Sequence, residues 1–457
     1  MTSTPRAVLW LRRDLRQSDH PALAAAAASG EVVPVWVHDP AIWDHAGVVK
    51  QAWLAASLRA LPFAEHLVVR RGDPAEVLPR LVEEVGASSV HLSTETTPYG
   101  VRRDARVKAA LDDITVDGGG VEWVETGSPY AVTPGRVVSN AGEGFKVFTP
   151  FCRAWREHGW RAPARTAPGE LDVAWGTAPS DDDALKRLDE AVAANTVELP
   201  PAGEEAAWAR WEEFADDGLT DYDDRRDRPD IAGTSRLSPY LSVGAVHPRS
   251  ILADLAARRS SGAKRYVSEI AWREFYADVL LRRPESAWRD LRDLGLAYDE
   301  PGELFDAWRR GETGYPIVDA GMRQMAATGW MHNRVRMITA SFLTKDLHVW
   351  WGHGARHFLE SLVDHDLASN NHGWQWVAGT GTDAAPYFRV FNPTLQGIRF
   401  DPSGDYVRRW VLELADLAGP AAHEPWLHGG APGYPDPVVD HGVERKEALQ
   451  RWADRAS

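Results

Sequence analysis

The sequence predicts an α/β domain built on a doubly wound parallel sheet, followed by an all-α domain. Between residues 6 and 126, short runs rich in β-branched residues alternate with amphipathic helical runs. From about Glu204 onward, helical periods dominate and strand signals nearly vanish. Strict alternation of strand and helix is typical of a parallel sheet with helices on both faces. The predicted organisation is a first domain at 1–130, an interdomain connection at 131–200 and a helical domain at 201–457.

Five strands and four helices are expected in the first domain. The strands lie at 7–11, 32–37, 67–70, 90–93 and 121–124, and the helices at 21–28, 49–61, 75–85 and 102–111. Such sheets bind ligands at the carboxyl ends of their strands. The loop after the first strand reads Arg12-Arg13-Asp14 instead of G-x-G-x-x-G, which argues against a standard dinucleotide site. A small-cofactor site and a merely solvated loop are both open at this point.

The strand and helix pattern is lost in residues 127–200. Pro, Gly, Ala and Asp dominate around 162–169 and 178–183, which predicts a long connection with one short helix at 151–158. After it, helices are expected at 204–216, 248–258, 264–282, 304–309, 317–328, 333–347, 354–362 and 444–453. Ser238-Pro239 and His247-Pro248 place proline at the first position of a helix.

Composition limits the classes of function. The single cysteine, Cys152, excludes an internal disulfide framework and a multi-cysteine metal cluster, and it fits a cytoplasmic protein. The N-terminus does not read as a signal peptide, and no apolar run reaches the length of a membrane span. A net charge of −15 argues against nucleic acid as a partner, although the arginines of the C-terminal half can still form a basic patch. We expect a monomer with no membrane partner.

The segment Gly233-Thr-Ser-Arg-Leu-Ser238-Pro239 combines three hydroxyl groups and an arginine before a predicted helix. The free backbone N–H groups and the dipole at a helix start favour an anion such as a phosphate. Ordinary capping of the helix by Ser238 explains the same spacing equally well. The residues alone leave both interpretations open.

A second segment, at 269–276, places Glu269, Trp272, Arg273 and Tyr276 on one face of a predicted helix. Aromatic rings and arginine on one face suit stacking on bases and pairing with phosphates. An amphipathic helix with internal side-chain pairs is the more common explanation of such a pattern.

The stretch from residue 329 to residue 393 is rich in tryptophan and polar side chains. Asn333 and Met337 are one helical turn apart. Asp364 and Asp366 could bind a metal, but HGARH at 353–357 lacks the glutamate of the H-E-x-x-H zinc motif, so no metal site is expected. So much indole beside carboxylates and amides predicts a pocket for a large, flat cofactor with polar edges.

Taken together, these segments resemble the photolyase/cryptochrome family, most closely its bacterial class I cyclobutane pyrimidine dimer photolyases. The resemblance covers nearly the whole chain, from WLRRDLR at the N-terminus to the region of Lys446. The matching strings, in order, are GTSRLSPYLSVG, EIAWREFY, GYPIVDAGMRQMAATGWMHNRVRMITASFLTKDL, DHDLASNNHGWQW and GTDAAPYFRVFNPTLQG.

This resemblance implies an antenna-chromophore domain at 1–130 and a helical FAD-binding and DNA-repair domain at 201–457. In the family, light excites reduced FAD, which donates an electron to a pyrimidine dimer flipped out of DNA. The dimer splits and the electron returns. The implied partner is DNA that contains cyclobutane pyrimidine dimers.

The resemblance also assigns roles by matching position. Arg336 should pair with Asp364 beside the flavin, and Asn370 should face flavin N5. Glu269 should hydrogen-bond the dimer and stabilise its radical anion, as a buried acid whose protonated form burial favours, while Met337 packs against the dimer. The implied FAD-binding residues are Tyr222, Thr234, Ser235, Arg236, Leu237, Ser238, Tyr266, Arg336, Asp364, Asp366 and Asn370. The implied DNA contacts are Arg226, Glu269, Trp272, Arg273, Asn333, Trp376 and Gln396, and the implied catalytic residues are Glu269, Asn333, Met337 and Asn370.

Three positions depart from the family pattern. The photoreduction chain is usually three tryptophans, and here Trp374 and Trp351 are followed by Tyr298, so the chain could end there or divert to another tryptophan. Tyr266 stands where related proteins often carry tryptophan. Members that use folate as antenna have Asn-Glu where this chain has Arg102-Arg103, which favours a deazaflavin over folate, with flavin mononucleotide or an empty site as further alternatives.

Two other functions fit the family. A (6-4) photoproduct lyase would carry histidines at the positions of Asn333 and Met337, and without them its proton transfer has no obvious donor. A cryptochrome-like photosensor without repair activity usually adds a C-terminal tail, whereas this sequence ends shortly after its last predicted helix.

Overall fold

The computed structural model describes residues 5–383, 389–417 and 419–454. Internal packing divides the chain into two compact units. The first unit comprises Met1–Thr196, Pro200–Asp216 and Arg236–Pro284, and the second comprises Val197–Leu199, Asp217–Ser235 and Glu285–Ser457. These units are defined by compactness alone, so they do not test the predicted domain limits. The limits of 1–130, 131–200 and 201–457 stay a prediction.

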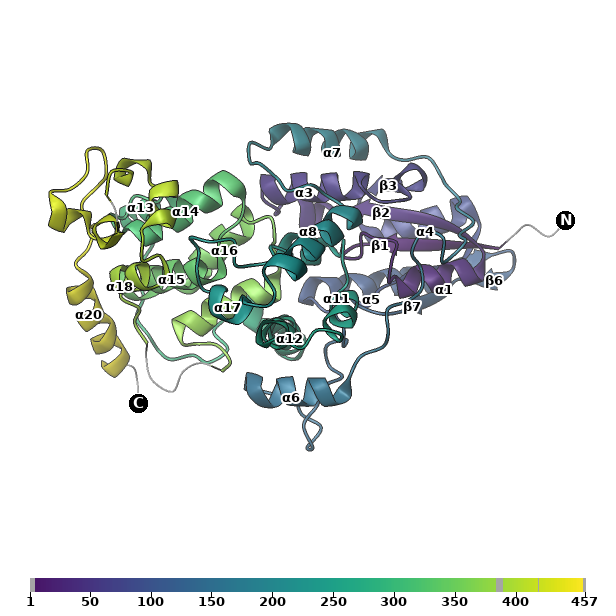
Figure 1. Cartoon of the computed structure of the whole chain (residues 1–457). Helices are drawn as coiled ribbons and strands as arrows, with labels where there is room; N and C mark the ends of the chain where they lie inside the picture. The colour runs from purple at the N-terminus through teal and green to yellow at the C-terminus, as the bar shows by residue number, and fades with distance from the viewer. Residues whose placement is uncertain (1–4, 384–388, 418, 455–457) are drawn as a thin grey trace. The chain divides into compact units, whose positions relative to one another are not determined.

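The first unit is built on a five-stranded parallel sheet (Figure 1), as predicted. Its strands are β1 (Arg6–Leu11), β2 (Glu31–His38), β3 (Val68–Arg71), β4 (Ala87–Leu92) and β7 (Glu122–Glu125). Their order is β3-β2-β1-β4-β7, and every neighbouring pair is parallel. The order reverses between β1 and β4, and doubly wound sheets bind ligands beyond the carboxyl ends of their strands at such a point.

The four predicted helices of this sheet are present. They are α1 (Pro21–Ser29), α3 (Val48–Arg59), α4 (Pro74–Val85) and α5 (Pro98–Asp112). Asp73 and Thr97 cap α4 and α5 through their side chains, and proline occupies the first position of both helices. Smaller elements complete the region: α2 (Pro40–Trp43), η1 (Ala64–His66), and the hairpin strands β5 (Thr115–Val116) and β6 (Gly119–Gly120).

The predicted connection contains two helices instead of one. Helix α6 (Phe148–His158) was expected, but α7 (Asp182–Ala194) was not. Its buried residues Ala184, Leu188 and Ala191 recur at helical spacing, and α7 packs along α3 (Figure 1). The Pro- and Asp-rich residues before it obscured this periodicity in the sequence.

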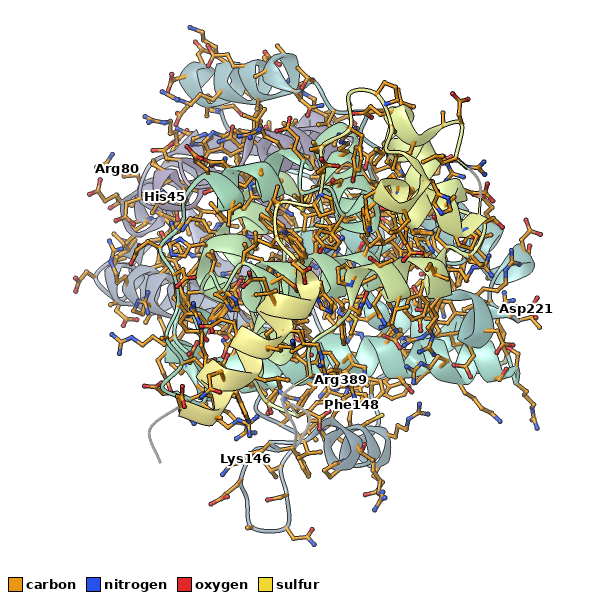
Figure 2. The ribbon with its side chains drawn as sticks, turned by 90° about the vertical axis from the view of Figure 1, so that its left-hand side faces the viewer. His45, Arg80, Lys146, Phe148, Asp221 and Arg389 are labelled. Atoms are coloured by element: carbon orange, nitrogen blue, oxygen red, sulfur yellow. The ribbon has the colours of Figure 1, made fainter. Side chains whose placement is uncertain are left out.

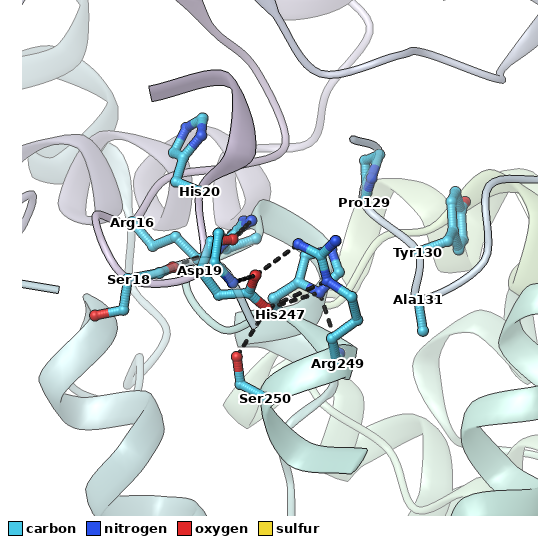
Figure 3. A network of polar contacts seen from close by, with 12 residues as sticks. Arg16, Ser18, Asp19, His20, Pro129, Tyr130, Ala131, His247, Arg249 and Ser250 are labelled. Carbon is cyan, nitrogen blue, oxygen red and sulfur yellow. Dashed lines mark hydrogen bonds and ion pairs between the residues drawn. The ribbon is translucent and has the colours of Figure 1, made fainter. Parts of the chain in front are cut away.

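Four further helices belong to the first unit. They are α8 (Glu204–Asp217), α10 (Ser238–Val243), α11 (Pro248–Leu255) and α12 (Ser261–Arg282). A buried network around Asp19 joins the loop after β1 to α11 and to the C-terminal end of α10 (Figure 3). Asp19 accepts from Arg249 Nη2 at 2.6 Å and from Ser250 Oγ at 2.9 Å, and Arg16 Nη1 donates to Gly244 O at 3.0 Å. Such fully partnered buried charges fix the position of the loop because leaving one unpaired would be costly.

The second unit is helical throughout its described part. Its α-helices are α9 (Tyr222–Arg225), α13 (Glu303–Arg310), α14 (Pro316–Thr328), α15 (Asn333–Ser341), α16 (Trp351–Ser361), α17 (Leu367–Ala378), α18 (Pro393–Phe400), α19 (Asp405–Trp410) and α20 (His441–Asp454). Short helical turns, η2 (Pro284–Ala287, at the unit border), η4 (Leu412–Leu414), η5 (Gly419–His423) and η6 (Pro425–His428), connect them. The core of this unit is a cluster of buried aliphatic and aromatic side chains that includes Trp308, Trp351 and Trp374.

The predicted helix at 333–347 is present, but its second half is a π-helix. Helix α15 ends at Ser341 and continues as a π-helix, η3 (Phe342–Asp346), in which Leu347 N donates to Phe342 O at 3.0 Å. Helix α17, which carries three of the predicted site residues and has a fourth, Asp366, as its N-cap, was not predicted as a helix. In the part of the chain that the structure describes, no helix has both the length and the hydropathy of a membrane span.

Candidate active site

In the second unit, Arg336 and Asp364 form the predicted ion pair. Arg336 on α15 donates from Nη2 to Asp364 Oδ2 at 2.7 Å and from Nη1 to Oδ1 at 3.2 Å. Its Nε donates to Met331 O at 2.8 Å, so three contacts hold the guanidinium in place. The Asp364 side chain is almost fully buried, whereas a quarter of the Arg336 side chain is exposed. A bidentate pair of this kind presents one rigid, half-buried cationic edge.

Helix α17 positions Asp366 and Asn370. Asp366 is the N-cap, and its Oδ1 accepts from Ser369 N at 2.8 Å. The side-chain nitrogen of Asn370 donates to Ala355 O at 3.0 Å and to Asn371 Oδ1 at 2.8 Å. Both amide hydrogens of Asn370 can therefore be used within the protein, which leaves the acceptor Oδ1 for a ligand.

These groups fit a flavin. The polar edge of reduced flavin carries a protonated ring nitrogen, and the Asn370 Oδ1 acceptor is the group that such an N–H needs. The Arg336 cation can face the carbonyl edge of the same ring system, and the neighbouring core of Trp374 and Phe358 supplies aromatic packing. The donors and acceptors of this unit therefore suit the isoalloxazine of FAD.

The predicted electron-transfer tryptophans are buried. Trp374 on α17 packs edge-on against Phe358 at 4.9 Å and against Trp308 at 6.1 Å between ring centroids. Trp351 begins α16 and lies 5.1 Å from Trp350 between centroids. Tyr298 is half-buried, and burial, with the charges of Asp290 and Asp293, raises the pKa of its phenol. All three predicted members of the photoreduction chain thus belong to one unit.

Asn333 and Met337 lie on the exposed side of α15. Asn333 Nδ2 is 4.0 Å from Met337 Sδ, which confirms that the two side chains are neighbours. Trp376 on α17 and Gln396 on α18 are both half-buried. Arg226 follows α9, and its Nε lies 3.9 Å from Asp227 Oδ1.

The GTSRLS segment does not form a conventional capped helix start. Leu237 is the N-cap of α10, and no side-chain hydrogen bond caps this helix, so the capping role considered for Ser238 is wrong. Arg236 adopts φ +53°, a left-handed conformation that is costly for a side chain other than glycine or asparagine. Tyr222, Thr234 and Ser235 belong to the second unit, and Arg236, Leu237, Ser238 and Tyr266 to the first.

The predicted face of α12 is present in the first unit. Glu269, Trp272, Arg273 and Tyr276 are all half-buried. Trp272 stacks on Phe148, which is labelled in Figure 2, with ring centroids 3.7 Å apart and ring planes at 7°. Arg273 Nη1 donates to Pro129 O at 2.9 Å. Glu269 Oε1 lies 3.2 Å from Arg265 Nε and keeps 28% of its side chain exposed. The expectation of a buried acid at Glu269 therefore does not hold in this structure.

Two acidic residues of these regions were missed by the sequence analysis. Glu274 on α12 is buried and accepts from Trp155 Nε1 at 2.5 Å and from Val132 N at 3.0 Å. Burial raises the pKa of its carboxyl to about 7 although its hydrogen bonds lower it. Asp290, in the second unit, accepts from the indole nitrogens of Trp350 and Trp351. The local sequence carries no signal for either contact, since the partners lie far away along the chain.

Arg103, one of the two residues that argue against folate, is buried at the carboxyl end of the sheet. Its guanidinium lies 4.7 Å from the Trp10 ring centroid, and that of Arg12 lies 4.5 Å from the same ring. Arg103 Nη2 and Nε both reach Asp104 Oδ1. The Arg103 guanidinium thus contacts the Trp10 ring and forms an ion pair with Asp104, both within this unit. Throughout the described ranges, no group of three or more potential ligand residues suits a metal ion.

Comparison with known proteins extends the similarity to both halves of the chain. Residues 7–169 match the family model described as DNA photolyase, and residues 266–454 match the FAD binding domain of DNA photolyase. A deoxyribodipyrimidine photo-lyase from Streptomyces griseus is 43% identical over 95% of this chain and 96% of that protein.

Solved structures give the same result. A class III photolyase from Agrobacterium tumefaciens superposes with a TM-score of 0.87 at 36% identity, covering 99% of this chain and 98% of that chain. An archaeal photolyase from Sulfolobus tokodaii with two FAD molecules has a TM-score of 0.82 at 26% identity, covering 98% of this chain and 100% of that chain. The chain belongs to the DNA photolyase family.

Proposed function

We propose that this protein is a light-dependent lyase that repairs cyclobutane pyrimidine dimers in DNA. The observation that supports this most directly is its full-length similarity to enzymes named deoxyribodipyrimidine photo-lyase. Reduced FAD, excited by light, supplies the electron that splits the dimer. The residues of the chain bind and orient the cofactor and the lesion.

The neighbouring pair of Asn333 and Met337 supports the choice of lesion. Repair of a (6-4) photoproduct requires a proton donor, and neither an amide nor a thioether supplies one. A cyclobutane dimer is split by an electron alone, so an amide that donates a hydrogen bond and a soft apolar group are sufficient. The 4.0 Å approach of Asn333 Nδ2 to Met337 Sδ places both groups on one exposed patch of α15.

We propose that Arg336, Asp364, Asp366 and Asn370 bind the ring system of FAD. Asp364 holds the Arg336 guanidinium rigid, and Asn370 offers its acceptor Oδ1 to the protonated ring nitrogen. The phosphates and the ribityl chain are assigned to Tyr222, Thr234, Ser235, Arg236, Leu237 and Ser238, with Tyr266 as an aromatic contact. A left-handed Arg236 is consistent with a backbone held for binding.

For DNA, the proposed contacts are Arg226, Glu269, Trp272, Arg273, Asn333, Trp376 and Gln396. Phe148 covers one face of Trp272, so a base or dimer can stack only on the other face. Arg273 is already bound to Pro129 O and lies 4.5 Å from the Tyr130 ring centroid, which suits a positioning role better than a phosphate contact.

For photoreduction, the proposed electron donors are Trp374 and then Trp351, with Tyr298 as the predicted third member. A second chromophore is part of the proposal, and a deazaflavin is favoured because Arg103 occupies a position that folate-binding members give to an acidic residue. We further propose that the enzyme is monomeric and cytoplasmic. Size-exclusion chromatography with light scattering tests the first point.

A repair assay tests the main proposal. Purified protein with FAD and a reductant is mixed with oligonucleotides that carry either a cyclobutane dimer or a (6-4) photoproduct, with and without blue light. We expect light-dependent loss of the cyclobutane dimer only. Repair of the (6-4) lesion would overturn the lesion assignment, and no repair of either lesion would favour a photosensor. Binding should also weaken steeply with salt if phosphates are contacted.

A further inference from the structure

The carboxylate of Asp290 connects two tryptophans of the second unit. Its Oδ1 accepts from Trp351 Nε1 at 2.5 Å and from Trp350 Nε1 at 3.3 Å. The two indole rings lie 5.1 Å apart between centroids and are tilted by 53°. Trp351 has no exposed surface, so its hydrogen bond to Asp290 is shielded from water.

Trp374 differs from this pair in its surroundings. It is 3% exposed, and its indole nitrogen is buried with no hydrogen-bond partner among the described residues. Trp308 and Phe358, which lie against it, are neutral rings. An electron vacancy on Trp374 is therefore not stabilised by an acceptor at its N–H, whereas one on Trp351 is.

An oxidised indole is a cation with an acidic N–H. A carboxylate at hydrogen-bond distance stabilises that cation by its charge, and more strongly in a buried site than in water. It can also accept the indole proton, and burial raises the pKa of Asp290, which makes it a better proton acceptor. Both effects make Trp351 a more stable location for the vacancy than Trp374.

We propose that Asp290 is a positioning residue that draws the electron vacancy of photoreduction from Trp374 onto the Trp350–Trp351 pair and holds it there. The proposal rests on the proposed photoreduction route. An electron passes from Trp351 to oxidised Trp374, which becomes neutral again. The Nε1 proton of Trp351 then moves to Asp290 Oδ1, leaving a neutral indole radical and a carboxylic acid. When an external thiol returns an electron to Trp351, the thiol becomes a thiyl radical and releases its own proton to water, and the proton on Asp290 moves back to Trp351 Nε1, so atoms and charges balance.

Tyr298 lacks the proton acceptor that the two tryptophans share, among the described residues. Its hydroxyl is buried without a hydrogen-bond partner in the described ranges, so no group is in place to take the phenol proton on oxidation. Trp350, in contrast, shares the acceptor of Trp351 through its own N–H. The vacancy is therefore held more stably on the tryptophan pair than on Tyr298, the proposed third member of the chain.

Flash photolysis of the FAD-bound protein tests the proposal. Asp290→Asn keeps the shape and an acceptor oxygen but removes the charge and the basicity. We expect the lifetime of the tryptophan radical to fall about tenfold, which corresponds to a modest loss of stabilisation. Asp293→Asn is the matched control, because the nearby Asp293 accepts from Gly295 N and not from an indole. Trp350→Phe should shorten the lifetime less.

A second measurement reports the geometry independently of photochemistry. In FAD-bound protein labelled with ¹⁵N-tryptophan and kept dark, the Trp351 indole proton should resonate downfield and move upfield in Asp290→Ala. If Asp290→Asn leaves the lifetime of the tryptophan radical as it was, the inference is wrong, even if the protein without the substitution repairs dimers. If the unchanged protein shows neither flavin photoreduction nor repair, the proposed function fails and the inference fails with it.

Discussion

At the scale of single residues, Gly354 decides how closely α16 approaches Trp374. A Cβ added to Gly354 would lie 2.3 Å from Trp374 Cη2 and 2.6 Å from Leu343 Cδ2, which are distances that require the core to move. We expect Gly354→Ala to destabilise the protein by about 1–3 kcal/mol, because overpacking outweighs the gain in helix propensity. Urea unfolding followed by circular dichroism measures this change.

The matched control for this substitution is Gly373→Ala on α17. A Cβ at Gly373 would meet no atom within 4 Å. Since alanine is a better helix former than glycine by about 1 kcal/mol, Gly373→Ala should leave stability unchanged or raise it. The two substitutions are chemically identical and should differ in sign. Equal effects would show that helix propensity, and not contact with Trp374, governs position 354.

The pair of Arg336 and Asp364 gives the second prediction at this scale. Asp364→Asn leaves the Arg336 guanidinium without its bidentate partner, so the cation should lose its fixed orientation. We expect the dissociation constant of FAD to rise at least about tenfold, a change of about 1.4 kcal/mol. Fluorescence titration of the FAD-free protein measures it. Glu413→Gln breaks the Arg323–Glu413 ion pair of the same unit and should leave FAD affinity unchanged.

The sequence revealed the chemistry of individual residues where a motif carried it. The Arg336–Asp364 pair and the contact between Asn333 and Met337 were expected and are present. The bond from Trp351 to Asp290 was not expected, because its two residues are 61 positions apart and no motif joins them. The exposure of Glu269 was also missed, since side-chain burial depends on packing that periodicity does not describe.

At the scale of elements, α18 depends on its cap. Asn392 precedes Pro393 at the first helical position, and Asn392 Oδ1 accepts from Leu395 N at 3.0 Å. We expect Asn392→Ala to cost about 1 kcal/mol, whereas Asn392→Ser, which keeps a capping oxygen, should cost much less. The free energy of unfolding in urea distinguishes them. If both variants lose the same amount, the cap does not stabilise this eight-residue helix.

Elements were predicted best where a strong local period had clear ends. All five strands of the sheet lie within three residues of their expected limits, because buried parallel strands read as short β-branched runs. Helix α17 was missed since its residues are mainly polar and aromatic, with no apolar stripe. The π-helix η3 was not distinguished from the α-helix before it, because its five residues, all buried, continue the same helical run in the sequence.

At the scale of the whole molecule, two sets of buried groups make stability depend on pH in opposite directions. Burial lowers the pKa of three histidines to about 4, namely His20, His357 and His372. Burial raises the pKa of Glu274 to about 7 and that of Asp319 and Asp401 to about 6. The histidines contribute stability that is lost as pH falls from 6.5 towards 4. The carboxyls contribute stability that is lost as pH rises from about 4 to about 7.

Glu274 allows one side of this balance to be removed. Its pKa is about 7 in the folded protein and 4.5 in the unfolded chain, so the folded state holds the proton more tightly. Its contribution is complete below pH 4.5 and disappears as pH rises through 7. Glu274→Gln abolishes this dependence, whatever constant penalty the amide introduces opposite Trp155 and Val132. The stability of the unchanged protein relative to the variant should therefore fall by up to about 3 kcal/mol between pH 4.5 and pH 8.

Urea unfolding of both proteins at half-unit steps of pH measures this difference. The exposed Glu212→Gln is the matched control for the loss of one carboxylate. A constant difference between Glu274→Gln and the unchanged protein across the range would mean that the three N–H donors around Glu274 keep it ionised in the folded state. A difference that changes with pH in the expected direction would mean that burial dominates over those donors. In that case Glu274 is a neutral, buried acid within α12, the helix that also carries Glu269 and Trp272.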